Sequence, residues 1–135
     1  MDAVFAPRIG VGIFSFGDDI QQYLGACDFE RSFSRYTDSE VYRIHDLELM
    51  IWTKNNIIES IGCYQECMYQ GRNLIGMTIS EFIQYTNEMY EGEIDELDFE
   101  EDSDEGQLVY DFDRMGSLVW TKGGRIVTII ASNIG

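Results

Sequence analysis

Hydrophobic and polar positions along the chain follow a pattern that occurs twice. Residues 41–62 read VYRIHDLELMIWTKNNIIESIG and residues 109–130 read VYDFDRMGSLVWTKGGRIVTII, and the two align without a gap. In each copy short apolar runs alternate with polar breaks, and the second run ends in Trp52 or Trp120. Runs of this length and spacing are typical of strands, so each copy predicts a three-stranded antiparallel meander.

Each meander contains a tight turn after its second strand. The turn residues are Asn55-Asn56 in the first copy and Gly123-Gly124 in the second. Asn and Gly tolerate the positive φ angles that two-residue hairpin turns need. The last strand of each copy is therefore predicted at Ile57–Ile61 and at Ile126–Ile130.

A weaker similarity precedes each meander, where DDIQQY at residues 18–23 resembles SEFIQY at residues 80–85. Both segments are predicted to be helices. Asp18 with Gln21, and Thr78 with Glu81, have the spacing of a capping box. Gly25 suits a left-handed end of the first helix.

The repeated unit is thus a glycine-containing apolar segment, a helix and a meander, at approximately residues 9–63 and 74–131. We expect an α+β fold in which these two units form a single domain spanning residues 1–135. The length of 135 residues is that of one ordinary domain. A hydrophobic content of 44% supplies a core that needs no metal or disulfide.

The chain is strongly acidic, with 25 Asp and Glu against nine Lys and Arg and a formal net charge of -16. This charge repels nucleic-acid phosphates and anionic membrane surfaces. No apolar run approaches the roughly 20 residues that span a bilayer. The first residues lack the pattern of a secretory signal, so the cytoplasm is the expected location.

The negative charge is concentrated in an insertion at residues 88–105. Eleven of its eighteen residues are acidic and none is basic, so it carries -11 of the -16. The helix caps of the two units, Asp18 and Thr78, are 60 residues apart, whereas Val41 and Val109 are 68 apart. The second unit therefore carries about eight extra residues between helix and sheet.

Two interpretations of the acidic insertion remain open. A run of like charges is most often a mobile, solvated loop. The apolar residues Ile94, Leu97 and Phe99 within it favour a docking surface instead, in which charge steers a basic partner and apolar anchors slow its release. The predicted partner-binding residues are Glu93, Ile94, Asp95, Glu96, Leu97, Asp98, Phe99, Glu100, Glu101, Asp102, Asp104 and Glu105.

Metal and cofactor sites are not expected. Cys27, Cys63 and Cys67 form no disulfide framework and are predicted to be free, partly buried thiols. Cys63 and Cys67 with His45 lack the fourth ligand of a zinc site. An EF-hand loop centred on Gly106 fails because Phe112 stands where a bidentate Glu is required.

Catalytic patterns are equally scarce, and the chain is not expected to be an enzyme. The single histidine, His45, falls in a predicted break between strands and is interpreted as a turn residue. Gly10, Gly12 and Gly17 lack the remaining positions of a phosphate-binding motif and are interpreted as strand and turn glycines. The two tryptophans occupy equivalent strand ends, which favours packing over a ligand cage.

These features together resemble a known family. A segment with FGD before a capped helix at residues 9–24, strand ends IW and VW, a turn and a final Ile-rich strand are similar to the small acidic immunity proteins of bacterial contact-dependent growth inhibition systems. The resemblance implies a cytoplasmic antitoxin that binds and neutralises one cognate toxin domain, commonly a nuclease, by occlusion. It implies no catalytic residues and leaves the toxin's activity open.

We therefore expect a monomer that forms a one-to-one complex with a basic toxin domain. An acidic surface facing a basic cleft raises the association rate. Two alternatives stay open: an acidic protein-interaction adaptor without an inhibitory role, and a small ligand-binding protein with a pocket between the two repeats. The binding surface could also be a helix face or the sheet face.

Overall fold

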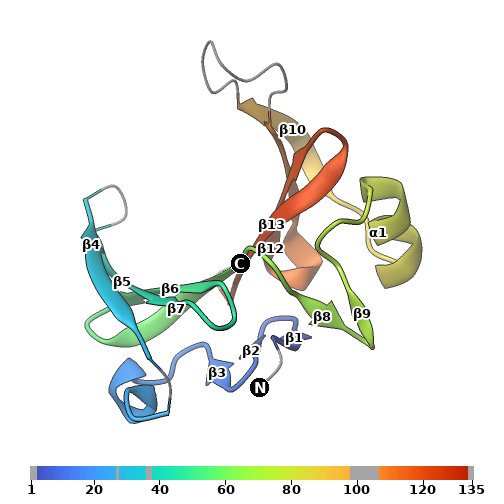
Figure 1. Ribbon diagram of the computed structural model, residues 1–135. Coiled ribbons are helices and arrows are strands. Elements are labelled where there is room, and N and C mark those ends of the chain that lie inside the picture. The colour runs from blue at the N-terminus through green and yellow to red at the C-terminus, as the bar shows by residue number, and fades with distance from the viewer. Residues whose placement is uncertain (1–2, 27, 36–37, 98–106, 134–135) are drawn as a thin grey trace.

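The computed structural model describes residues 3–26, 28–35, 38–97 and 107–133, and its centre is one eight-stranded antiparallel sheet (Figure 1). The strand order is β10-β11-β12-β13-β7-β6-β5-β4. Two four-stranded meanders therefore lie side by side and meet at β13 and β7. The strand bounds are β4 Glu30–Ser34, β5 Ser39–Ile44, β6 Leu49–Lys54, β7 Ile57–Cys63, β10 Glu91–Leu97, β11 Gln107–Phe112, β12 Ser117–Lys122 and β13 Arg125–Ser132.

The meeting of β7 and β13 has local two-fold symmetry. Gly62 lies opposite Ile130, which is the equivalent residue of the other copy, 68 positions further along the chain. Ile61 likewise pairs with Ala131, the equivalent of Cys63. Equivalent residues face each other only where a two-fold axis relates the strands, so the seam between β7 and β13 relates the two halves of the sheet.

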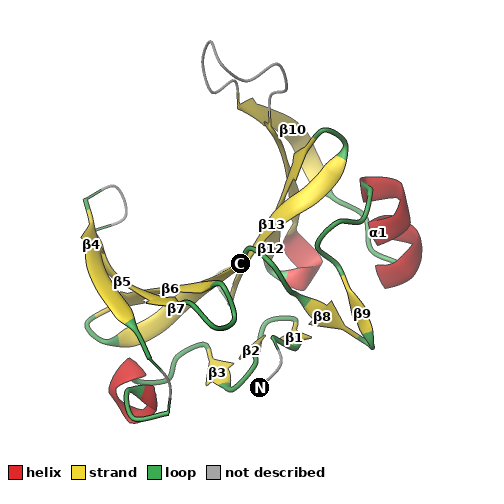
Figure 2. Cartoon of the chain, in the orientation of Figure 1, coloured by secondary structure: helices red, strands yellow, loops and turns green. Residues whose placement is uncertain are grey.

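Small hairpins and helices cover one face of the sheet, as Figure 2 shows, while the two limbs of the sheet diverge from the seam. The hairpins β1–β3 lie beside one limb, and β8, β9 and α1 lie beside the other. These elements are β1 Phe5–Ala6, β2 Gly10–Val11, β3 Phe14–Ser15, the 3₁₀ helix η1 Ile20–Tyr23, β8 Met68–Tyr69, β9 Arg72–Asn73, α1 Ile79–Thr86 and the 3₁₀ helix η2 Asp113–Met115.

The hairpin turns are those that the sequence predicted. Lys54 pairs with Ile57 across Asn55-Asn56, and both asparagines have positive φ angles, 53° and 67°. Gly123 and Gly124 have φ angles of 61° and 81° in the matching turn. Two consecutive residues with positive φ match the right-handed twist of the strands, which confirms both turns.

The segments before the two helices contact the sheet in the same way. The amide of Gly17 donates to the carbonyl of Ile58 at 2.9 Å, and the amide of Gly76 donates to that of Ile126 at 2.8 Å. Ile58 and Ile126 occupy equivalent positions. The same hydrogen bond thus fixes each leading segment to the last strand of its own half.

The hydrophobic core lies between the sheet and the elements that cover it. Phe14, Ile20 and Phe82 come from the covering elements and are almost fully buried. The ring of Phe82 meets that of Phe112 in β11 with centroids 4.6 Å apart. Buried aromatic contacts of this kind join α1 to the second half of the sheet.

The predicted fold class was wrong, because the structure is mostly β. Among the described residues the only α-helix is α1, and each half contributes four strands to one continuous sheet. The α+β prediction of two helix-plus-three-strand units missed β4 and β10, the outermost strands. Edge strands need not bury a full face, so the polar sequence ERSFS at residues 30–34 and the acidic sequence EGEIDEL at residues 91–97 gave no apolar alternation.

The first predicted helix is only a single 3₁₀ turn. Asp19, not Asp18, is its N-cap and accepts a hydrogen bond from the amide of Gln21 at 2.9 Å. Ile20 is buried, but Leu24, one turn later, is 43% exposed, so no apolar face extends the helix. Gly25 does not adopt a left-handed conformation. In α1, by contrast, the predicted capping box of Thr78 and Glu81 is confirmed.

The absence of a side chain at Gly62 is predicted to be required at the seam. A Cβ atom there would lie 3.0 Å from the Trp52 ring and 3.2 Å from the Tyr64 ring. We expect Gly62→Val to lower the free energy of unfolding by about 1–3 kcal/mol through overpacking, as measured by urea denaturation. The loss should be smaller in a Trp52→Leu background, and an equal loss in both backgrounds would contradict the proposed clash.

Candidate functional site

The predicted acidic segment begins as an edge strand of the sheet. Residues 91–97 form β10, which pairs on one side with β11, and no described strand pairs with its other side. Glu93 is exposed and Ile94 is 40% exposed. Asp95, Glu96 and Leu97 lie in the strand. The other predicted partner-binding residues, Asp98, Phe99, Glu100, Glu101, Asp102, Asp104 and Glu105, lie outside the described residues.

An aromatic cluster holds the start of β10 against the sheet. The ring of Tyr90 lies 5.0 Å from that of Tyr110 and 6.0 Å from that of Phe112, measured between centroids. Phe112 in turn contacts Phe82 of α1. Burial raises the pKa of Tyr110, so its hydroxyl stays neutral beside these rings. These ring contacts therefore fix the start of the acidic strand β10 to the core.

The pairing of β10 with β11 is irregular. Its register shifts between Glu91 and Asp95, and Gly92 has a φ of 73°. The positive φ favours glycine at this bulge. Beyond the bulge Asp95 pairs with Val109 and Leu97 with Gln107, so the acidic residues continue along the sheet edge.

This arrangement can bind an extended polypeptide of opposite charge. An edge strand presents unpaired backbone N–H and C=O groups to which another strand can be added. The exposed carboxylates of Glu91 and Glu93 repel acidic chains and attract basic ones. Beside them Glu88, Met89, Tyr90 and Arg114 line a hollow of about 270 Å³, in which Met89 is 58% exposed.

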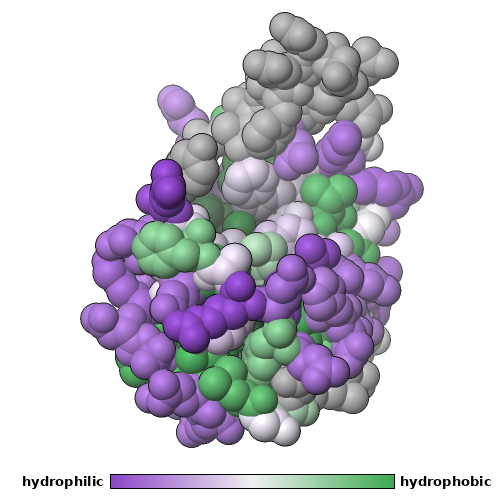
Figure 3. All heavy atoms as spheres, turned by 60° about the vertical axis from the view of Figure 1, so that its left-hand side comes forward, coloured by the Kyte–Doolittle hydropathy of each residue, from purple (hydrophilic) through white to green (hydrophobic). Residues whose placement is uncertain are grey.

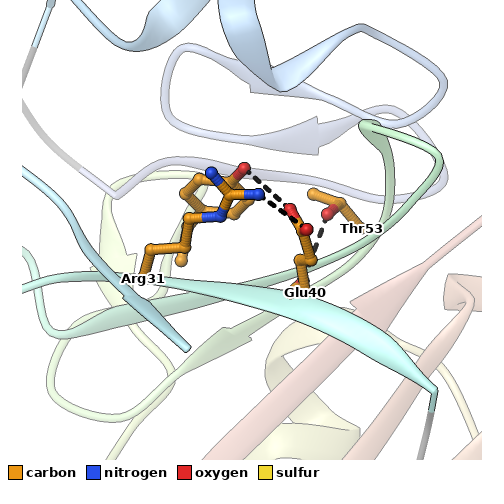
Figure 4. A network of polar contacts seen from close by, with 4 residues as sticks. Arg31, Glu40 and Thr53 are labelled. Carbon is orange, nitrogen blue, oxygen red and sulfur yellow. Dashed lines mark hydrogen bonds and ion pairs between the residues drawn. The ribbon is translucent and has the colours of Figure 1, made fainter. Parts of the chain in front are cut away.

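The opposite edge of the sheet carries a polar network in which an arginine is paired with a glutamate (Figure 4). Arg31 of β4 donates to Glu40 of β5 at 2.6 Å, and the hydroxyl of Tyr42 donates to the same carboxylate at 3.2 Å. Thr53 donates to the backbone carbonyl of Glu40 at 3.1 Å. The hydrogen bond from Arg31 holds the pKa of Glu40 below its usual range. The Arg31–Glu40 contact adds to the backbone pairing that holds β4 on β5.

The interpretations of the cysteines and of His45 can be compared with the structure. Cys63 and Cys67 are free and buried, as predicted, whereas Cys27 lies outside the described residues. A hydrogen bond with Cys63, together with burial, raises the pKa of the Cys67 thiol well above its usual value, so this thiol is a poor nucleophile. His45 is exposed in the turn after β5, and its Nε2 lies 2.7 Å from Glu30.

The glycines lie in a strand and in turns, as interpreted, and the two tryptophans lie at equivalent positions of β6 and β12. Gly10 lies in β2, and Gly12 and Gly17 have positive φ angles in the following turns. The Trp52 ring lies against Gly62, so this tryptophan packs on the sheet. Within the described part of the chain, the indole nitrogen of Trp120 is buried without a hydrogen-bond partner.

The face of the sheet opposite the hydrophobic core holds a groove that sequence analysis missed. Register places Trp52, Leu118 and Ile130 on this face. Two hollows of about 270 and 260 Å³ share Ser60 and Ile130, and together we call them the seam groove. The seam groove is lined by Ser39, Trp52, Glu59, Ser60, Asp111, Asp113, Gly116, Ser117, Leu118, Ile130 and Ser132.

Hydrophobic patches are visible between hydrophilic side chains in Figure 3, which turns the left-hand side of Figure 1 toward the viewer.

The residues of the seam groove come from both halves of the chain. They come together only because β7 pairs with β13, and this pairing left no local signal in the sequence.

Comparisons with known proteins assign no family to the chain. It matches no protein-family model, no curated protein and no solved structure. No cluster of three or more metal-ligating side chains is present among the described residues. In the same part of the chain, no helix has the length and apolar character needed to cross a membrane.

The contact between Arg31 and Glu40 predicts a pH dependence of stability. Because the pKa of Glu40 is lowered on folding, its stabilising contribution is present above the unfolded pKa and lost as pH falls through the folded pKa. We expect Glu40→Gln to lose less stability than the wild type between about pH 7 and about pH 3 in urea titrations. Glu93→Gln serves as the charge control and should follow the wild type. Equal acid sensitivity of wild type and Glu40→Gln would contradict this assignment.

Proposed function

We propose that this chain is an immunity protein that binds and neutralises a cognate toxin domain in the cytoplasm. The proposal combines the family resemblance of the sequence with one structural observation, the acidic edge strand β10. In this role the chain has no catalytic residues and no cofactor. It acts as a monomer that covers the active site or substrate surface of its target in a one-to-one complex.

The observation that supports this function best is the position of the charge. The described part of the acidic insertion includes β10, which lies at an edge of the sheet and is anchored by Tyr90 against Tyr110 and Phe112. A basic nuclease cleft attracts such carboxylates because it is built to hold phosphates. Residues 93–105 would then occupy positions where the nucleic-acid backbone normally lies.

Each kind of residue has a separate role in this proposal. Carboxylates act over several ångströms and raise the rate of encounter, most strongly at low salt. Apolar side chains such as Ile94 act only after contact and lower the dissociation rate. An adaptor without an inhibitory role could use the same surface, and protection of cells from the toxin distinguishes the two.

The acidic insertion is predicted to control association. Glu100, Glu101, Asp102 and Asp104 are changed together to their amides, and binding to the toxin domain encoded by the adjacent upstream gene is measured by stopped flow. We expect association at low salt to slow by about tenfold and its salt dependence to flatten. The matched control changes four exposed acids of the first half to amides: Asp28, Glu30, Asp38 and Asp46.

Two results would contradict this assignment. Equal slowing by both variants would show that total charge matters and not its position. Absence of capture and of protection, when wild-type chain and upstream product are expressed together, would remove the immunity function itself.

Ile94 is predicted to be an anchor in the complex. Ile94→Ser should raise the dissociation rate by about tenfold and leave the association rate nearly unchanged. Ile13→Ser is a matched control, because Ile13 is 41% exposed and Ile94 is 40% exposed. Dissociation rates that are the same for both variants would exclude Ile94 from the interface.

A further inference from the structure

We propose that the seam groove is a second docking surface, which takes a basic segment of a protein partner. Such a segment presents Arg or Lys on either side of an apolar side chain. The seam groove is lined by other strands than β10, although its Asp111 pairs with Glu91 at the start of that strand, and this inference does not rest on the proposed function. Either surface can fail its test without the other.

The floor of the seam groove is apolar and open to a partner. Leu118 of β12 is 38% exposed, and Ile130 of β13 and Trp52 of β6 are half-buried. Apart from the β1–β2 turn, whose Arg8 reaches the end of the groove at Gly116, no described helix or loop covers this face, because the hairpins and α1 pack on the core side. An apolar side chain laid across Leu118 and Ile130 would remove both from water.

The charged side chains that line the seam groove are all acidic. Asp111 and Asp113 line one hollow and Glu59 lines the other, while no Lys or Arg lines either. Arg8 lies at one end, but its guanidinium donates to the backbone carbonyls of Asp113 and Arg114. Carboxylates on both sides of an apolar floor are complementary to a segment with two separated basic residues.

The equivalent hollow of the other half shows that the fold does not require this charge. It is lined by Arg43, Glu48, Met50 and Tyr64 and has a volume of about 290 Å³. Arg43 stands 68 positions before Asp111, at the same place in the strand, and donates to Glu48 at 3.1 Å. Because the equivalent strand carries an arginine at this position, the strand itself does not need a carboxylate there.

The shape of the seam groove favours a polypeptide as the occupant. The two hollows share Ser60 and Ile130, so their lining extends from Ser39 of β5 across the seam to Asp111 of β11. An elongated surface of this kind fits a chain segment, whose successive side chains reach the apolar floor and the acidic walls in turn.

The test is an NMR titration of the full ¹⁵N-labelled chain. The probe is a short synthetic peptide in which two arginines flank two leucines, and the control peptide carries glutamate in place of arginine. The chain has two tryptophans, so the Trp52 indole N–H gives a resolved signal from the groove. We expect the basic peptide to shift this signal and the amides of Ser60 and Leu118, and the acidic peptide to shift none.

Two matched double variants distinguish the seam groove from the edge strand. Glu59→Gln with Asp111→Asn removes two charges from the groove. Glu88→Gln with Glu93→Gln removes two from the region where β10 begins and leaves Glu91, the partner of Asp111, unchanged. We expect the first to weaken peptide binding by about tenfold and the second by less than about twofold. Dispersed amide spectra show that each variant is folded.

Three results would overturn the inference. Shifts confined to β10 would place the peptide on the acidic strand. Equal weakening by the two double variants would reduce the binding to general charge attraction. Absence of any shift at Trp52, Ser60 and Leu118 would leave the seam groove without the proposed occupant.

Discussion

The pairing of β7 with β13 is the interaction on which the rest of the molecule depends. Each four-stranded half has one apolar face, and the ladder between these two strands joins the halves into one sheet with one core. At its centre Gly62 faces Ile130, and the missing side chain leaves room for the Trp52 ring. Gly62 therefore takes part in the backbone pairing of β7 with β13 and, on the same residue, in the packing of the Trp52 ring.

Local chemistry made part of this fold predictable. The positive φ angles of Asn55 and Asn56 follow from residues that tolerate them, and the cap of α1 follows from the spacing of Thr78 and Glu81. The outer strands β4 and β10 could not be predicted from alternation, because an edge strand is stabilised by its neighbour and not by burial of its own side chains. The prediction of a first helix was wrong because it also depended on burial. After Ile20, no buried residue continues the apolar face that a helix would need.

The two candidate surfaces also differ in how far the sequence alone could reveal them. The acidic strand is contiguous in sequence, so composition was sufficient to identify it, although its place at a sheet edge was not foreseen. The seam groove combines Trp52 and Glu59 with Asp111 and Ile130, which are distant in sequence. Their proximity depends on a long-range strand pairing, and no local pattern encodes it.

The central place of β13 also relates the fold to the order of synthesis. Strands β4 to β7 can pair with one another as they leave the ribosome, and β10 to β12 can do the same later. The inner edge of β7 stays unpaired until residues 125–132 have emerged, because no earlier strand lies beside it. An unpaired inner edge can associate with other nascent chains. Translation of β13 is therefore the step that ends this exposure and closes the core.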